Sequence, residues 1–486
     1  MNMSKISILH ISDLHKTKGV HYDTLLDSLR NDRDRWQQES ILAPSFIVIS
    51  GDLIEGAYTD DEIRNQYAEV SIFLEELVKV FLGGDKSRLI MVPGNHDVNR
   101  ACSSNSMVEV TSPSADEMDI LKRSFWKPEC LVRFDWKTMN FFKVSNIVKN
   151  NERFSLFKEF YDKFYGGLRV FPSNSTIEAF VCPFEKEHIA FAGFNSCNFL
   201  DDKNVAGNID EESITSISSE LRRLDNDGYL IVGVWHHHYY GDPYILNYMS
   251  RDVFFPMSEK GIRIGLFGHQ HVSEVADEYI NPRYVDERQR KENLMLLVSS
   301  GTLFGGEKQL QPGFRRQYNI IEIKRQKLES QIDIAINIRE DLSKNVNSKI
   351  PYWQSRLIAS TMDNKIHKKV YVKGVNKDQL LLQLMKETTV SCKYEQACNT
   401  LQNLGLEDKH VRALFDEFLQ KASAHFQIEI LQKIDISSQE TIILLYAILN
   451  EKNKDAAKQI SENKTIMSVI SSDSILKDIW NKINQL

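Results

Sequence analysis

Short apolar runs, each ending at a polar cluster, dominate residues 1–330 of the chain. The runs are Ile6–Ile11, Phe46–Ile49, Leu89–Val92, His188–Phe194, Leu230–Val234, Ile262–Phe267, Leu294–Val298 and Tyr318–Ile323. Runs of this length that are rich in Val and Ile and apolar on both faces are typical of buried strands. Amphipathic stretches lie between several of them, at Asp23–Glu39, Asp61–Phe81 and Glu211–Leu224. This alternation predicts an α/β domain over residues 1–330.

The pattern changes in the last part of the chain. Residues 376–486 contain no proline and one glycine, Gly405. Helix interiors tolerate both residues poorly, so this stretch predicts a separate all-helical bundle. A stabilising appendage and a surface for a protein partner or for self-association are both open as its role. The charged, mixed segment 331–375 is expected to contain a last strand and the connector.

Composition narrows the class of protein. The 486 residues are 42% apolar and 26% charged, which excludes disorder as the main state. A net charge of −7 argues against a generally basic nucleic-acid coat. No apolar run reaches the ~20 residues that a membrane span needs. The six cysteines form no CxxC pair, which favours reduced thiols and a cytoplasmic location.

A segment expected to form an insert or cap, at about residues 101–185, mixes basic and aromatic residues. Residues 121–171 hold eleven Lys or Arg against five Asp or Glu, among many Phe, Tyr and Trp. Such a mixture can follow a phosphate backbone and stack bases. However, Phe157, Phe160 and Phe164 have helical spacing, which indicates a packed core. An insert with its own core is the favoured interpretation, and a cap that faces the substrate is the alternative.

Residues able to bind metals follow five of the apolar runs. The turns begin with Ser12-Asp13-Leu14-His15, Ser50-Gly51-Asp52, Pro93-Gly94-Asn95-His96-Asp97, Trp235-His236-His237-His238 and Gly268-His269-Gln270-His271. Seven of the thirteen histidines of the chain lie in these turns. Because the carboxyl ends of strands line one edge of an open α/β sheet, we expect these side chains to meet there. Any one of these short motifs is common by chance, but five in this order are not.

Imidazole and carboxylate together suit Zn, Fe or Mn better than Ca or Mg. The ligands exceed what one ion needs, and they divide between two ions if one carboxylate bridges them: Asp13, His15, Asp52, Asn95, one of His236 to His238, His269 and His271. Two ions ~3.5–4 Å apart form a clamp for displacement at phosphorus, in which a water between them becomes the nucleophile. The sequence therefore predicts a phosphoester hydrolase.

These motifs resemble those of the calcineurin-like metallophosphoesterase superfamily over residues 1–330. The resemblance implies a four-layer α/β/β/α sandwich with a dinuclear site at the sheet edge. One ion would take Asp13, His15, Asp52 and His271, and the other would take Asp52, Asn95, His236 and His269. His236 is favoured as the ligand of the histidine triplet because it comes first, and His237 is the alternative. His96 would be the acid at the leaving oxygen, and Asp97 would orient it.

The absence of an arginine from the motif around Asp52 narrows the range of expected substrates. Phosphoprotein phosphatases of this superfamily carry GDxxDRG and GNHE, whereas this chain has Gly51-Asp52-Leu53-Ile54-Glu55-Gly56 and ends the second motif in Asp97. The missing arginine favours a phosphodiesterase that acts on nucleotides or nucleic acid. A DNA or RNA nuclease subunit that works with a partner protein is the alternative, and a non-catalytic metal-binding scaffold is the second. The sequence does not identify substrate-binding residues.

Overall fold

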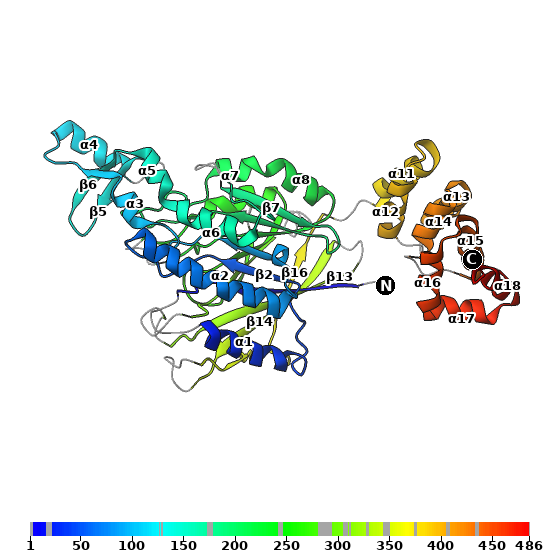
Figure 1. Ribbon diagram of the computed structural model, residues 1–486. Helices are drawn as coiled ribbons and strands as arrows, with labels where there is room; N and C mark the ends of the chain where they lie inside the picture. The colour runs from blue at the N-terminus through cyan, green and yellow to red at the C-terminus, as the bar shows by residue number, and fades with distance from the viewer. Residues whose placement is uncertain are drawn as a thin grey trace. The chain divides into compact units, whose positions relative to one another are not determined.

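A computed structural model describes most of the chain, which forms two compact units, residues 1–373 and 374–486 (Figure 1). The described residues are 3–15, 22–125, 127, 130–172, 178–241, 246–279, 294–304, 310, 313–326, 330–343, 350–373, 377–404, 409–432 and 437–485. Within them, no helix is long and apolar enough to cross a membrane.

Two large sheets form the centre of the first unit. One has the order β15-β14-β13-β1-β2-β3, with β16 also paired to β14, and the other has the order β11-β12-β10-β9-β8-β7. The strands of the first are β1 (Met3–Ile11), β2 (Phe46–Ser50), β3 (Leu89–Val92), β13 (Gln317–Gln326), β14 (Gln331–Asp341), β15 (Trp353–Ser355) and β16 (Ile366–Tyr371). Those of the second are β7 (Ala179–Phe184), β8 (Ile189–Phe194), β9 (Leu230–Val234), β10 (Ile262–Phe267), β11 (Val275–Tyr279) and β12 (Leu294–Ser299). All eight predicted strands are present.

Alternation along the strands explains why the sheets stack. In β1, Ile6 and Ile8 belong to the core between the two sheets, where they share a cluster with Val232 of β9 and Leu266 of β10. Leu9 and Ile11, at the odd positions of the same strand, belong to the core on the opposite face. Because successive side chains of a strand face opposite ways, each sheet buries both of its faces and needs a helical layer outside.

Helices supply both outer layers. α1 (Tyr22–Trp36), α2 (Asp60–Leu82) and α6 (Ser155–Tyr165) pack on the outer face of the first sheet. α7 (Glu211–Ser216), α8 (Ser218–Asn226) and α9 (Phe254–Glu259) pack on the outer face of the second. The result is the four-layer α/β/β/α sandwich that the family resemblance implies.

The segment 331–375, expected to contain a last strand and the connector, holds three strands, β14, β15 and β16. β14 pairs with β13 from Gln317↔Glu340 to Arg325↔Ile332, and β16 pairs with the other edge of β14. Half of the charged residues of this segment lie on β14 and β16, and Arg339 of β14 is buried against the Asp32 carboxylate of α1. The first unit therefore extends to Lys373.

The insert contributes to two cores. Its outer part is a small sheet of β4 (Met107–Glu109), β5 (Val132–Asp135) and β6 (Asn140–Val144) in the order β4-β6-β5, with α3 (Arg100–Ser104), α4 (Ala115–Ser124) and α5 (Ile147–Asn151) beside it (Figure 1). Leu121, Val132 and Phe141 form a separate small core there. The aromatic residues of α6, in contrast, join the main core under α2. Most of the aromatic pattern is therefore structural.

The second unit is helical, as expected. Its helices are α11 (Lys377–Met385), α12 (Tyr394–Leu404), α13 (Lys409–Lys421), α14 (Ala424–Leu431), α15 (Ser438–Glu451), α16 (Lys454–Glu462), α17 (Lys464–Ser472) and α18 (Ser474–Ile483), with a π-helix at Lys386–Val390. They enclose one apolar core that includes Phe415, Leu444 and Ile479. The helices of the second unit therefore bury their apolar faces against one another.

Candidate metal centre

The five predicted turns meet at one place. β1, β2 and β3 are parallel neighbours in the first sheet, and β9 and β10 are parallel neighbours in the second. Each of these strands ends directly before one of the turns. Because the sheets stack face to face, the carboxyl ends of both strand sets adjoin and bring the polar side chains together.

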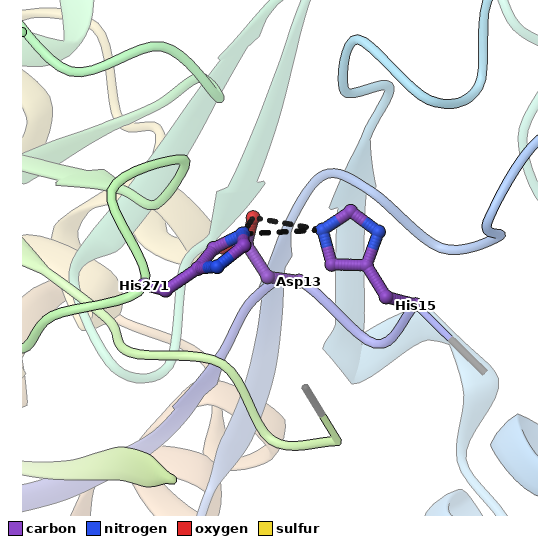
Figure 2. A group of neighbouring side chains, drawn as sticks. All are labelled: Asp13, His15 and His271. Atoms are coloured by element: carbon purple, nitrogen blue, oxygen red, sulfur yellow. Dashed lines mark hydrogen bonds and ion pairs between the residues drawn. The ribbon is translucent and has the colours of Figure 1, made fainter. Parts of the chain in front are cut away.

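One group of ligands surrounds Asp13 (Figure 2). The Asp13 Oδ1 atom lies 3.2 Å from His271 Nε2 and 3.5 Å from His15 Nε2. The two ring nitrogens are 3.2 Å apart, and His15 Nε2 is 3.3 Å from Asp52 Oδ2. Two imidazole nitrogens and a carboxylate oxygen that converge in this way match the donor set of a transition metal.

A second group lies on the other side of Asp52. The His236 Nε2 atom is 3.3 Å from Asp52 Oδ2 and 2.9 Å from Asn95 Oδ1. The His269 Nδ1 atom is 2.8 Å from Asn95 Oδ1 and 3.2 Å from His236 Nε2. The structure thus gathers all seven predicted ligands, with Asp52 in contact with both groups.

His236 and His237 differ in the hydrogen-bond partners of their rings. The Nδ1–H of His236 donates to the Ser50 carbonyl oxygen at 2.8 Å, which directs Nε2 to Asp52. His237 Nδ1 instead lies 2.9 Å from Ser196 Oγ, and this hydroxyl accepts from the backbone N–H groups of both histidines. His236 is therefore the member of the triplet that faces the cluster. Ser196 follows β8 and Asn195, and sequence analysis gave it no role because a serine hydroxyl does not stand out as a metal ligand.

The backbone at the site is strained. Asp13, His15, Asp52, His269 and His271 have φ values of 53°, 34°, 53°, 76° and 58°. Residues other than glycine rarely adopt this left-handed backbone conformation, and those that do cluster at functional sites. Gly94 has a related reason, because a Cβ atom there would lie 2.2 Å from Asp52 Oδ1. The fold thus forces these turns into shapes that aim the side chains at one point.

The chemistry of the donors fits two divalent cations. Burial raises the pKa of Asp52, but the rings of His236, His96 and His15 outweigh it and hold that pKa below its ordinary value. Burial also raises the pKa of Asp13, and His271 is the main neighbour that reverses this effect. Both carboxylates are therefore anionic at neutral pH, and together with the imidazole nitrogens they offer the mixed oxygen and nitrogen ligands that Mn, Fe and Zn accept.

His96 stands beside the cluster. Its ring centroid is 4.4 Å from that of His15, and its Nδ1 lies 2.7 Å from the Glu55 carbonyl oxygen. Because a carbonyl only accepts, Nδ1 carries the proton and donates it. His96 also lies close enough to His15 and Asp52 to join a metal-ligating group. The geometry therefore allows His96 to act either as an acid or as a ligand.

Asp97 has a different position from the one expected. Its buried carboxylate accepts hydrogen bonds from the backbone N–H groups of Leu53 and Gly94 and from the Tyr67 hydroxyl. The described contacts of the His96 ring do not include Asp97. Asp97 therefore ties the turn at Leu53 to the turn that contains His96, and the Glu55 carbonyl orients the ring. Sequence could not show this, because a backbone carbonyl leaves no signature.

This layered fold, with histidines and carboxylates gathered at its strand ends, defines a metallophosphoesterase. The calcineurin-like phosphoesterase family matches residues 6–273, which is more than half of the chain, and the chain belongs to that family. No curated protein matches the chain.

Three solved structures are among those similar to the chain. A dimetal phosphatase from Danio rerio is 10% identical, covers 68% of this chain and 95% of its own, and has a TM-score of 0.33. The calcineurin-like phosphoesterase YfkN from Bacillus subtilis is 12% identical, with coverages of 85% and 100% and a TM-score of 0.28. Vps29 from Chaetomium thermophilum is 10% identical, with coverages of 76% and 98% and a TM-score of 0.23.

Proposed function

We propose that this chain is a dinuclear metal-dependent phosphodiesterase. The observation that carries the proposal is the position of Asp52, whose Oδ2 lies 3.3 Å from both His15 Nε2 and His236 Nε2 and so joins the two ligand groups. One ion would be held by Asp13, His15, Asp52 and His271, and the other by Asp52, Asn95, His236 and His269. When bound, two such ions supply Lewis acidity toward the phosphoryl group and lower the pKa of a water molecule.

The protein itself handles the proton of the leaving group. The Nδ1–H group of the His96 ring donates to the Glu55 carbonyl, which leaves Nε2 as the atom for proton transfer. In the doubly protonated ring, Nε2–H can give its proton to the leaving oxygen as the phosphorus–oxygen bond breaks, and the neutral ring that results keeps Nδ1–H on Glu55. Asp97 ties the turn at Leu53 to the turn at Gly94 that precedes His96.

Small phosphodiesters are the substrate class that we place first. The prediction of nucleic acid came from the insert, but its aromatic residues on α6 are core residues. Arg133 is buried, and its Nε donates to Asp201 at 2.7 Å. Lys122, Arg123 and Lys127 are exposed and remain available for a polynucleotide. A nucleotide diester fits the proposal, and a nuclease that works with a partner protein is the second candidate.

Turnover by metal-loaded protein tests the proposal. The chain would be reloaded with Mn, its metal content measured, and its rates compared on bis(4-nitrophenyl) phosphate and 4-nitrophenyl phosphate. We expect two ions per chain and faster diester hydrolysis. Faster hydrolysis of the monoester would reverse the substrate class, and two bound ions without turnover on either ester would support the non-catalytic scaffold.

A further inference from the structure

The loop that orients His96 is itself held by one side chain of α2. Gln66 Oε1 accepts from the backbone N–H groups of Glu55 and Gly56 at 3.0 and 3.2 Å. Its Nε2 donates to the Gly56 carbonyl oxygen at 3.2 Å. One amide therefore satisfies three polar backbone groups of two consecutive residues, and it leaves the Glu55 carbonyl for His96.

The loop is also pressed against His96. Gly56 has a φ of 82°, and a Cβ atom there would lie 3.1 Å from the His96 carbonyl oxygen. Gly56 and His96 both line a cavity of about 860 Å³, together with Ile54, Ala57, Tyr58 and Val98. His96 and the 55–56 loop therefore border the same open space.

We infer that Gln66 is a positioning residue for the acid of this enzyme. It fixes the 55–56 loop, the Glu55 carbonyl fixes the His96 ring, and the ring meets the leaving group. The inference rests on the proposed function. Gln66 lies on a helix of 23 residues whose neighbouring Tyr67 donates to Asp97 Oδ1 at 3.0 Å. Two successive residues of one helix therefore bind the loop that orients the His96 ring and the carboxylate that fixes the turn containing His96.

The dependence of kcat on the leaving group distinguishes the loss of a positioned acid from a general disruption of the structure. A good leaving group, such as 2,4-dinitrophenolate, departs without a proton, whereas phenolate needs one. In Gln66→Met, which keeps the length and removes the three hydrogen bonds, kcat for methyl phenyl phosphate should fall roughly 10- to 100-fold. For methyl 2,4-dinitrophenyl phosphate it should fall less than about threefold, because the metal-assisted attack is untouched.

Matched variants control for stability. Gln66→Glu keeps the acceptor for both N–H groups and loses only the donor, so it should recover part of the phenyl-ester rate. Gln37→Met makes the same chemical change at an exposed position beyond α1 and should leave both rates near those of the unaltered chain. Equal losses on both esters in Gln66→Met would overturn the inference, because they would indicate a purely structural role.

A second readout does not depend on turnover. In the Zn-loaded protein, at a pH where the His96 ring is neutral, its ¹⁵N chemical shifts should report a protonated Nδ1, and in Gln66→Met this signature should weaken as the neutral ring samples both tautomers. If no ester is hydrolysed but the shift changes, the proposed function fails and the positioning contact stands. If His96→Ala shows leaving-group dependence while Gln66→Met changes neither rate nor shift, the proposed function stands and this inference fails.

Discussion

Asp52 contacts both ligand groups of the candidate metal centre. Its Oδ2 faces His15 and His236, and its Oδ1 accepts from the backbone N–H of His96 at 2.8 Å. In Asp52→Asn, one anionic oxygen shared by both ligand groups becomes a neutral amide atom. We expect both ions to bind more weakly and turnover to fall by at least ~10²-fold. Elemental analysis of the folded, Mn-reloaded variant checks this, and loss of only one ion would contradict a bridging role.

His96 lies where either of two roles is geometrically available, so its replacement is informative. As an acid, His96→Ala should lower turnover of a poor leaving group ~10²–10⁴-fold and leave the metal content at that of the unaltered chain. As a ligand, it should lower metal content and turnover together. We expect the first result, because the ring is already held by Glu55 through Nδ1. Metal content and kcat measured on one preparation distinguish the two outcomes.

The sequence predicted the side chains of the site better than it predicted their supports. Asp13, Asn95 and His271 could be found because a ligand-type residue follows an apolar run. The supports of the site are the Ser50 and Glu55 carbonyls and the Gln66 amide, and none of them stands in a recognisable motif. Backbone groups are chemically alike at every position, so only the folded geometry reveals which of them orients a ring.

At the scale of elements, the strands and helices between the motifs were predictable, and the small or charged strands were not. β13 is an apolar run, whereas β14 carries Asp333, Asn337 and Arg339 among its isoleucines. The Arg339 guanidinium is buried because its Nε donates to Asp32 Oδ2 of α1 at 2.9 Å. A pattern of single residues cannot show such a partner, which lies about 300 residues away in the chain.

The insert provides a prediction about substrate choice. Neutralising Lys122, Arg123 and Lys127 together should weaken polynucleotide binding only if the exposed face of the insert meets phosphates. Because we place small diesters first, we expect DNA and RNA affinity and their salt dependence to change little. Arg133 is left intact, since its removal would bury the Asp201 carboxylate without its partner. A flatter dependence of affinity on salt in the triple variant would favour the nuclease alternative.

At the scale of the whole molecule, the two units should be separable. All the predicted ligands lie between Asp13 and His271, in the first unit. A chain that ends at Lys373 should therefore fold, bind two ions and hydrolyse a small phosphodiester at the rate of the full chain. Metal analysis and kcat on bis(4-nitrophenyl) phosphate check this. A folded but inactive product would mean that the helical domain completes the site.

A shorter chain gives the matched comparison. Ending at residue 330, where the sequence placed the domain boundary, would remove β14, β15 and β16 from the first sheet. β13 would then lose its partner along nine paired positions, and the apolar face that includes Ile332, Ile334 and Ile336 would be missing from the core between the sheets. We expect this product to be insoluble or unfolded by circular dichroism. A cooperative unfolding transition would contradict the boundary at Lys373.

The left-handed backbone at the five ligand residues has a consequence for how this protein would respond to selection. Each such residue costs of the order of 1–3 kcal/mol relative to a relaxed turn, and glycine would relieve much of it. Laboratory evolution for heat resistance in a chelating medium should therefore accumulate substitutions at Asp13, His15, Asp52, His269 and His271. The same procedure with Mn present should keep all five residues, because bound cations stabilise the strained backbone conformation. Comparing the thermal stability of the two lineages would measure how much stability this fold loses by keeping the ligand residues.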